Sequence, residues 1–126
     1  MKKIINASGA PAPVGPYNQA VRHGDTLYLS GQIAIDQVSG MLVTGDIVSE
    51  THRVLQNIRA VLQEAGADME NILKCTIFVT DIRQYSAINE VYASYFREQT
   101  APARELVEVS HLPKGVHIEI SAIAGL

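Results

Sequence analysis

Apolar residues recur at helical spacing between residues 47 and 65. Separations of three and four positions place side chains on one face of an α-helix, which buries that face against a core. Asp46 can cap the start of this segment by accepting from free backbone amides, and Gly66 can end it in a left-handed conformation. The segment is predicted as a helix with the apolar face Ile47, Thr51, Val54, Leu55, Ile58, Val61, Leu62 and Ala65.

A second stripe at helical spacing follows Asp81, which can cap the start of another helix. This stripe is rich in aromatic residues, and such stripes are far more often part of the core than a cofactor-binding surface. We therefore predict that a second helix packs into the core the residues Tyr85, Ile88, Val91, Tyr92, Tyr95 and Phe96.

Segments of strand-forming residues lie on both sides of the two helical segments. They cover residues 18–22, 26–35, 72–80, 105–110 and 116–124. The turn His23-Gly24-Asp25 predicts that the first two strands form a hairpin. The turn of residues 111–115 predicts that the last two strands are neighbours in the sheet.

Strands around two helices indicate an α+β fold in one domain that covers residues 1–126. A mixed sheet with both helices on one face would bury both apolar stripes and leave the other sheet face uncovered. Apolar residues occur at both phases of Leu27–Ile35, so we expect this face to take part in oligomerisation. The Pro/Gly-rich segment Gly9–Pro16 should form an ordered, extended loop, because its prolines fix φ and remove backbone donors.

Composition and charge exclude several classes of function. The formal net charge is −3 and the basic residues form no run, so nucleic acid is not expected as a partner, since phosphate binding needs clustered cations. No apolar run approaches the roughly 20 residues of a membrane-spanning helix. The single cysteine, Cys75, cannot form an internal disulfide, which fits a reducing, cytoplasmic setting.

The last predicted strand carries a candidate acid, Glu119. Strand alternation places it on one face with His117 and Ser121, opposite the apolar Val116, Ile118, Ile120 and Ala122. A carboxylate that loses hydration there would have its pKa raised towards values useful for acid/base chemistry. On alternation alone, an exposed glutamate on a half-solvated strand is the simpler interpretation.

Arg104 is a candidate anchor for an anion, at the entrance of the penultimate strand. Its guanidinium can present paired donors to a carboxylate more rigidly than a lysine can. A surface arginine or a partner in a structural ion pair is the simpler interpretation of this residue alone. The combination with Glu119 is more suggestive, because the two final strands are expected to be neighbours.

Other signatures of catalysis do not occur. The four histidines have no paired-ligand spacing, so no metal site is expected. Ser30 lies in a Leu-Ser-Gly-Gln segment that lacks the glycine-serine-glycine elbow of hydrolases. The scattered glycines form neither a phosphate-binding loop nor a dinucleotide fingerprint.

Several segments in a fixed order resemble the RidA/YjgF family. The family's GPY-x-QA entrance is matched by residues 12–20 (APVGPYNQA), and its SGQ strand by residues 29–32 (LSGQ). Its C-terminal signature is similar to residues 102–104 (PAR), 112–115 (LPKG) and 118–120 (IEI). Together these segments span nearly the whole chain.

The resemblance implies a chorismate-mutase-like α+β fold and a homotrimer with clefts between subunits. It also implies hydrolysis of 2-imino or enamine acids, such as 2-iminobutanoate and 2-iminopropanoate, to 2-oxo acids and ammonia, which would protect pyridoxal-phosphate enzymes. No metal or organic cofactor would be needed. By resemblance, Arg104 binds the substrate carboxylate and Glu119 positions or activates water, while the pocket is lined by Tyr17, Ser30, Gly31, Asn89 and the backbone of Leu106.

The chain departs from the common family pattern directly after Arg104. Glu105 and Leu106 stand where many members have serine and cysteine or another small residue. Alternation predicts that Leu106 shares the side of Arg104 while Glu105 points away, so the leucine should narrow the pocket. Ser121 replaces the second acid of the family's IEIE run, with little expected effect.

Two rival functions remain. A non-enzymatic binding module could use the same trimeric cleft to sense a 2-oxo acid, and it would need Arg104 but no turnover by Glu119. An RNA-cleaving or chaperone role of the kind sometimes attached to family members is disfavoured by the acidic balance.

Overall fold

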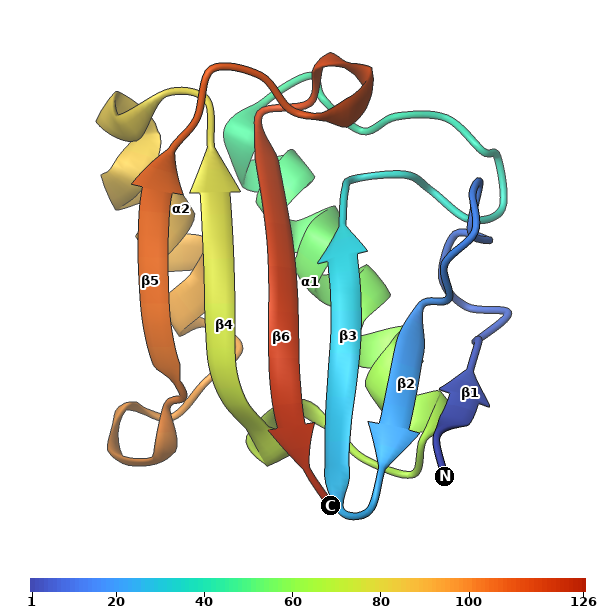
Figure 1. The fold of residues 1–126 in the computed structure, drawn as a ribbon. Helices are drawn as coiled ribbons and strands as arrows, with labels where there is room; N and C mark the ends of the chain where they lie inside the picture. Colours follow the sequence, from blue (N-terminus) through green and yellow to red (C-terminus); the bar gives the residue numbers. More distant parts are fainter.

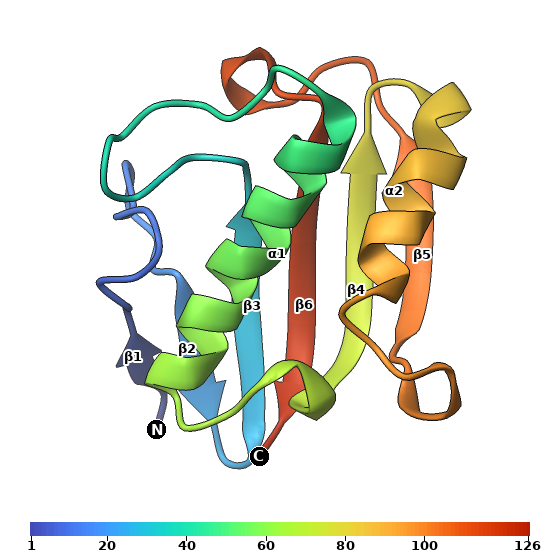
Figure 2. The same ribbon diagram turned by 180° about the vertical axis from the view of Figure 1, so that it is seen from behind.

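A computed structural model describes residues 1–126 as one six-stranded sheet with both α-helices on one face (Figures 1 and 2). The elements are β1 (Lys3–Ile5), β2 (Ala20–His23), β3 (Thr26–Gln32), α1 (Ile47–Glu64), β4 (Ile72–Val79), α2 (Tyr85–Ala93), β5 (Ala103–Glu108) and β6 (Ile118–Gly125). The strand order is β1-β2-β3-β6-β4-β5, in which β4 and β5 are parallel and the other pairs antiparallel. The prediction of a mixed α+β sheet with helices on one face is confirmed.

The first helix has the predicted ends. The Asp46 side chain accepts from the backbone N–H of Ser49 at 2.8 Å, which satisfies one of the amides that a helix start leaves free. Gly66, with φ +78, follows the helix end in the left-handed region. Neither helix combines the length and the apolar character needed to span a membrane.

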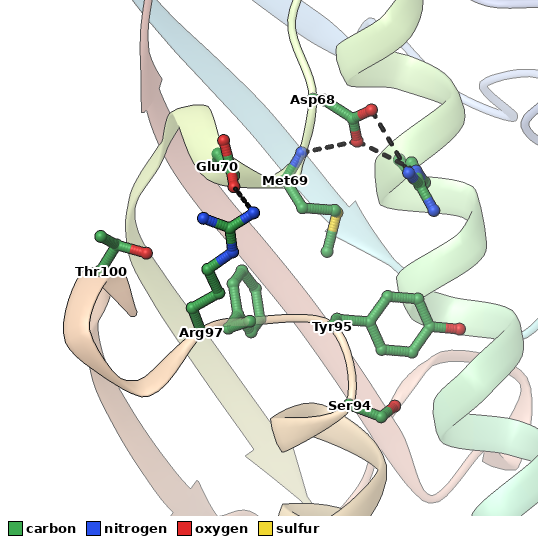
Figure 3. A pocket seen from close by; sticks show the side chains of 9 residues that line it. Asp68, Met69, Glu70, Ser94, Tyr95, Arg97 and Thr100 are labelled. Atoms are coloured by element: carbon green, nitrogen blue, oxygen red, sulfur yellow. Dashed lines mark hydrogen bonds and ion pairs between the residues drawn. The ribbon is translucent and has the colours of Figure 1, made fainter.

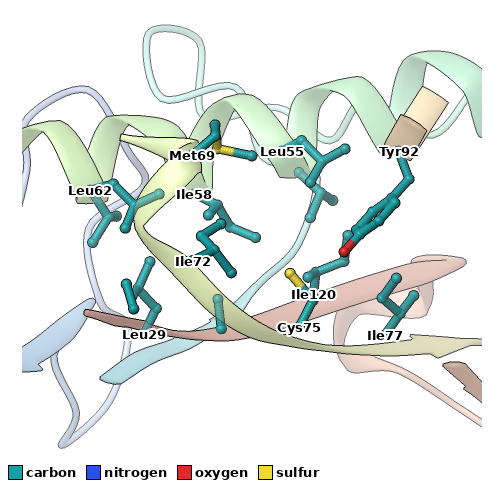
Figure 4. Close-up of a cluster of buried hydrophobic side chains, with 14 of the residues drawn as sticks. Leu29, Leu55, Ile58, Leu62, Met69, Ile72, Cys75, Ile77, Tyr92 and Ile120 are labelled. Atoms are coloured by element: carbon teal, nitrogen blue, oxygen red, sulfur yellow. The ribbon is translucent and has the colours of Figure 1, made fainter. Parts of the chain in front are cut away.

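The core lies between the two helices and the sheet (Figure 4). Helix α1 buries the stripe predicted for it, and alternate residues of β4 and β6 meet that stripe. Side chains with no exposed surface include Val54, Leu55, Ile58, Val61, Leu62, Cys75, Ile77, Ile118 and Ile120. Because successive side chains of a strand point to opposite faces of the sheet, the remaining residues of β4 and β6 face away from the helices.

The opposite face of the sheet has no cover from this chain, as Figure 1 shows. Tyr28 of β3, Leu73 of β4 and Val107 of β5 lie 51%, 58% and 43% exposed. Large apolar side chains left in water on a sheet mark a surface suited to association. As predicted, this chain leaves one face of its sheet uncovered.

The prediction that the last two strands are neighbours was wrong. Strand β4 lies between them, parallel to β5 and antiparallel to β6. The connection of residues 109–117 passes over the end of β4, with Lys114 and Gly115 in the left-handed region at φ 57 and 69. In sequence, a short linker of this kind resembles a hairpin turn. In the structure, the β-branched strand of residues 72–79 takes the place beside β6 instead.

Two smaller predictions also differ from the structure. Helix α2 ends at Ala93, although its apolar stripe continues to Phe96, because a short turn replaces the last part of the helix. Strand β1 was not predicted; its three residues pair with β2 at the sheet edge.

A buried carboxylate fixes the start of β6 to α1. Glu50 has no exposed surface, and its carboxylate accepts from the backbone N–H groups of His117 and Ile118 at 2.7 and 3.1 Å. The His117 Nδ1 lies 2.7 Å from the same carboxylate, so this ring turns to Glu50 rather than sharing the free face with Glu119. The contact positions the strand that carries Glu119.

Replacing Glu50 with alanine should destabilise the protein, because it leaves the buried N–H groups of His117 and Ile118 without an acceptor. We expect the free energy of unfolding, measured by urea titration, to fall by about 2–4 kcal/mol. The matched control Glu64→Ala alters an exposed glutamate on the same helix and should change the free energy of unfolding by less than about 0.5 kcal/mol. Equal losses in the two variants would contradict this role of Glu50.

Candidate active site

Glu119 lies on β6 and faces the side of the sheet that the helices leave free. Its sequence neighbours Ile118 and Ile120 are fully buried beneath the helices, and alternation directs Glu119 the other way. The residue is half-buried, and this desolvation raises the pKa of its carboxyl group. No hydrogen bond or opposite charge offsets the loss of hydration, so the carboxylate is available to a ligand or a proton.

Gly31 leaves the space that the Glu119 carboxylate occupies. A Cβ atom at Gly31 would lie 2.7 Å from the Glu119 Oε2 and 2.8 Å from its Cδ, closer than real Cβ contacts allow. The φ angle of Gly31 is not in the left-handed region. The requirement for glycine here is therefore one of space and not of backbone conformation.

The residues around Glu119 come from the N-terminal loop and β3. A cavity of about 110 Å³ is lined by Tyr17, Gly31, Lys114 and Glu119 among others. The Ser30 hydroxyl donates to the Asn18 carbonyl oxygen at 2.6 Å, which ties β3 to the loop that carries Tyr17. Of the residues predicted for the pocket, Tyr17 and Gly31 thus line this cavity with Glu119, whereas Ser30 does not line it.

Gln19 holds this loop in place and was not identified from sequence as a site residue. Its side chain is 2% exposed; its Oε1 accepts from the Ala7 N–H at 2.6 Å and its Nε2 donates to the Pro11 carbonyl at 2.7 Å. These bonds tie the segment before Tyr17 to the start of β2. The sequence signal for this role is the position of Gln19 as the glutamine of the GPY-x-QA match.

Arg104 lies on β5 and faces the opposite side of the sheet, towards α2. Its Nη1 donates to the Asn89 Oδ1 at 2.8 Å and its Nη2 donates to the Tyr85 hydroxyl at 2.9 Å. The guanidinium carbon lies 4.8 Å from the centroid of the Tyr92 ring. Arg104, Asn89 and Tyr92 line a cavity of about 400 Å³.

No carboxylate of the chain forms an ion pair with Arg104. The seven ion pairs involve other residues, and both hydrogen-bond acceptors of Arg104 are neutral. Glu105, its sequence neighbour, points away and pairs with Lys74 at 2.6 Å, as alternation predicted. The positive charge of Arg104 is thus left for an anionic ligand.

Leu106 is on the same side of β5 as Arg104, but it does not line the same cavity. Its register partner is Ile77, which is fully buried, and the leucine packs against the core. The residues that line the cavity beside Arg104 do not include it. Within one chain, the side chain of Leu106 therefore does not narrow the space in front of the guanidinium.

Tyr85 contacts Arg104 although its spacing assigned it to the core. It is 42% exposed, and its hydroxyl accepts from the guanidinium. The distance of four residues to Asn89 places both on one face of α2. That relation to a predicted pocket residue is the only signal in the sequence for this role.

A single chain does not bring Arg104 and Glu119 together. Across β4, Arg104 pairs with Cys75 and Glu119 with Phe78. This register separates the two residues by about 10 Å along the strands and about 10 Å across them. They also face opposite sides of the sheet, so one small ligand cannot contact both within one copy.

Another cavity, of about 530 Å³, lies between the ends of α1 and α2 (Figure 3), and none of the predicted site residues lines it. Its charged residues are already paired: Arg59 with Asp68 at 2.9 Å and Arg97 with Glu70 at 3.7 Å. The cavity therefore offers no free charge to a ligand. Nowhere in the chain do three His, Cys, Asp or Glu side chains converge as a metal site would require.

Comparison with known proteins identifies the family of this chain. A family model described as Endoribonuclease L-PSP matches residues 7–126, and the proteins most similar to this chain include Rid proteins and imine deaminases. The chain belongs to this RidA/YjgF family. Its chorismate-mutase-like fold is that of the family.

Three members of the family illustrate the similarity. A 2-iminobutanoate/2-iminopropanoate deaminase of Capra hircus is 45% identical over 124 residues, covering 98% of this chain and 90% of the relative. The Rid family protein YyfA of Yersinia pestis, of unknown function, is 48% identical with a TM-score of 0.97, and 100% of each chain is covered. TdcF of E. coli, solved with bound serine, is 39% identical with a TM-score of 0.93, and 98% of each chain is covered.

Replacing Gly31 with alanine should displace the Glu119 carboxylate, since the backbone accepts alanine and the flexible side chain must give way. We expect the pKa of Glu119, followed by carboxyl NMR, to fall towards the ordinary glutamate value as hydration returns. The control Gly45→Ala places a Cβ in open space and should leave the pKa of Glu119 unchanged. An unaltered Glu119 pKa in the Gly31→Ala protein would contradict the close approach.

Proposed function

We propose that this protein hydrolyses small 2-imino acids, such as 2-iminobutanoate and 2-iminopropanoate, to 2-oxo acids and ammonia. The observation that carries the proposal is that neither Arg104 nor Glu119 has an oppositely charged partner in its own chain. Arg104 is a half-buried cation with only neutral partners, and Glu119 is a half-buried carboxylate with none. A substrate with an anionic end and an electrophilic carbon beside it would use both, and relatives named as imine deaminases support this choice.

Arg104 is the proposed anchor for the substrate carboxylate. A guanidinium has five N–H donors, and the contacts to Asn89 and Tyr85 use only two of them. Paired, charge-assisted hydrogen bonds from the remaining donors would fix the position of the adjacent imine carbon. Orientation is the main requirement, because a protonated imine is already electrophilic.

Glu119 is the proposed base for the attacking water. The water oxygen adds to the imine carbon while Glu119 takes one water proton, which gives a tetrahedral aminol. That proton then passes to the amino nitrogen. The C–N bond breaks as Glu119 takes the proton of the hydroxyl group, and the products are the 2-oxo acid and ammonia. A raised pKa suits a group that first accepts and then returns a proton.

If Arg104 and Glu119 act on the same substrate, their separation within one chain means that two copies would form each site. Arg104 and Asn89 of one copy would face Tyr17, Ser30, Gly31 and Glu119 of the next, with the Leu106 backbone available to the ligand. The free sheet face, with Tyr28, Leu73 and Val107 exposed, supplies an apolar surface for this contact. We propose a homotrimer with three such clefts, since a closed ring repeats one heterologous contact.

The proposed reaction needs no metal or organic cofactor, because water addition to an iminium requires only orientation and proton transfer. Its biological role would be to remove reactive imines or enamines released by pyridoxal-phosphate dehydratases and so to protect such enzymes. The unpaired, buried Cys75 is compatible with the cytoplasm, where we place this activity.

A binding module for small carboxylates is the second candidate, and one observation favours it. Arg104 and the residues that hold its guanidinium all come from one chain, so carboxylate binding does not depend on Glu119 in the same copy. The relative TdcF, solved with bound serine, is an example of a family member that holds a small carboxylate. RNA cleavage has less support, because the net charge is −3 and Arg104 is flanked by no other cation in its cavity.

Substitutions at the two charged residues separate hydrolysis from binding. Arg104→Ala should lower kcat/KM for 2-iminobutanoate by about a hundredfold or more and abolish measurable binding of 2-oxobutanoate. Glu119→Gln should lower kcat by about 10²–10⁴-fold while binding of 2-oxobutanoate persists. The measurements are ammonia release from freshly generated imine and isothermal titration.

The control for both variants is Glu105→Gln, which removes an exposed carboxylate on β5 that points away from Arg104. It should retain the activity of the parent protein. Unchanged hydrolysis in Arg104→Ala would reject the mechanism. Binding without any hydrolysis by the parent would support the binding module instead.

A further inference from the structure

The Arg104 guanidinium is held by three residues of one helix face. Tyr85, Asn89 and Tyr92 lie on α2 at separations of four and three residues, so their side chains project to the same side. Asn89 accepts from Nη1 and Tyr85 accepts from Nη2, at 2.8 and 2.9 Å. The Tyr92 ring lies 4.8 Å from the guanidinium carbon.

These contacts fix different degrees of freedom of the guanidinium. The Tyr92 ring restrains its position but leaves it free to rotate in its own plane. One acceptor on each terminal nitrogen prevents that rotation. Without the Tyr85 hydroxyl, Nη2 loses its only hydrogen-bond partner in the chain, and the guanidinium is held at one end.

Core packing does not explain Tyr85. Its ring is 42% exposed at the first turn of α2, in contrast to Tyr92, which is 6% exposed. The buried Tyr92 hydroxyl has no hydrogen-bond partner, so that residue acts on Arg104 only through its ring. The Tyr85 hydroxyl and the Asn89 amide are the polar groups that orient the cation.

We propose that Tyr85 is a positioning residue that sets the Arg104 guanidinium for a ligand carboxylate and so determines the preference for carboxylates over neutral analogues. The inference rests on the proposed function, in which Arg104 is the anchor. The phenol oxygen accepts from Arg104, so the phenol proton remains to be donated to an acceptor beside the guanidinium. A carboxylate has two acceptor oxygens, so one can accept from Tyr85 while the other accepts from Arg104. An amide has a single acceptor oxygen, and its NH₂ group cannot accept.

Tyr85→Phe removes the hydroxyl and retains the ring, and 2-oxobutanoate and its neutral analogue 2-oxobutanamide serve as probes. We expect the Kd of 2-oxobutanoate to rise about tenfold, with little change for 2-oxobutanamide, by isothermal titration. In the hydrolysis of 2-iminobutanoate, KM should rise by a similar factor while kcat stays within about twofold. A purely structural role of Tyr85 would not produce this split.

The matched control is Tyr95→Phe, which removes another phenol hydroxyl that hydrogen-bonds within the chain, to His52, and does not contact Arg104. It should leave both Kd values and KM unchanged. In an Arg104→Lys background, Tyr85→Phe should have a smaller effect on 2-oxobutanoate binding, since a lysine lacks the Nη2 group that Tyr85 orients and only the bond from the phenol to the ligand remains to be lost.

The outcomes distinguish this inference from the proposed function. Hydrolysis by the parent with an unchanged 2-oxobutanoate Kd in Tyr85→Phe overturns the role of Tyr85 and leaves the function intact. Binding of 2-oxobutanoate without hydrolysis overturns the proposed function, while the comparison of Kd values still tests Tyr85. A parent protein that does not bind 2-oxobutanoate overturns both.

Discussion

The placement of β4 between β5 and β6 is the constraint on which the candidate site depends. Because paired residues of neighbouring strands share a face, the register through Cys75 and Phe78 assigns Arg104 to the helix side and Glu119 to the free side. A shift of β5 or β6 by one residue would move the charged residue of that strand to the other face of the sheet. The buried Glu50, which binds the start of β6, helps to fix that register.

Each of the two charged groups is incompletely satisfied within one chain. Arg104 has neutral hydrogen-bond acceptors but forms no ion pair, and Glu119 lies in a space that Gly31 leaves open without any donor. Half-buried charges without partners cost stability, so their presence on two different faces supports the proposal that two copies of the chain form each site. The free sheet face supplies a surface for that proposed contact.

The sequence predicted the helices and most strands because hydrophobic periodicity and capping residues are local signals. Asp46 and Gly66 define the ends of α1 by interactions within a few residues. The order of the strands could not be obtained in this way, because the turn after β5 resembles a hairpin connection while β4 competes for the same neighbour. Periodicity likewise assigned Tyr85 to the core, since it reports which face a residue occupies and not how far along the helix the core extends.

The candidate site was only partly accessible from sequence. Alternation correctly directed Glu105 away from Arg104 and Leu106 to the same side, whereas the roles of Glu50 and Gln19 depend on contacts between distant segments. The family signature named the residues around Arg104 and Glu119, and the structure shows that they form two separate groups. Spacing along the chain cannot reveal that division.

A complementation experiment tests the shared site most directly. Subunits carrying Arg104→Ala and subunits carrying Glu119→Gln, each inactive alone, are mixed before assembly, and mixed oligomers are verified by native mass spectrometry. If two copies form each site, random pairing restores both residues in about one quarter of the clefts, and imine hydrolysis returns to a corresponding level. Mixed oligomers without any regained activity would contradict a site shared between copies.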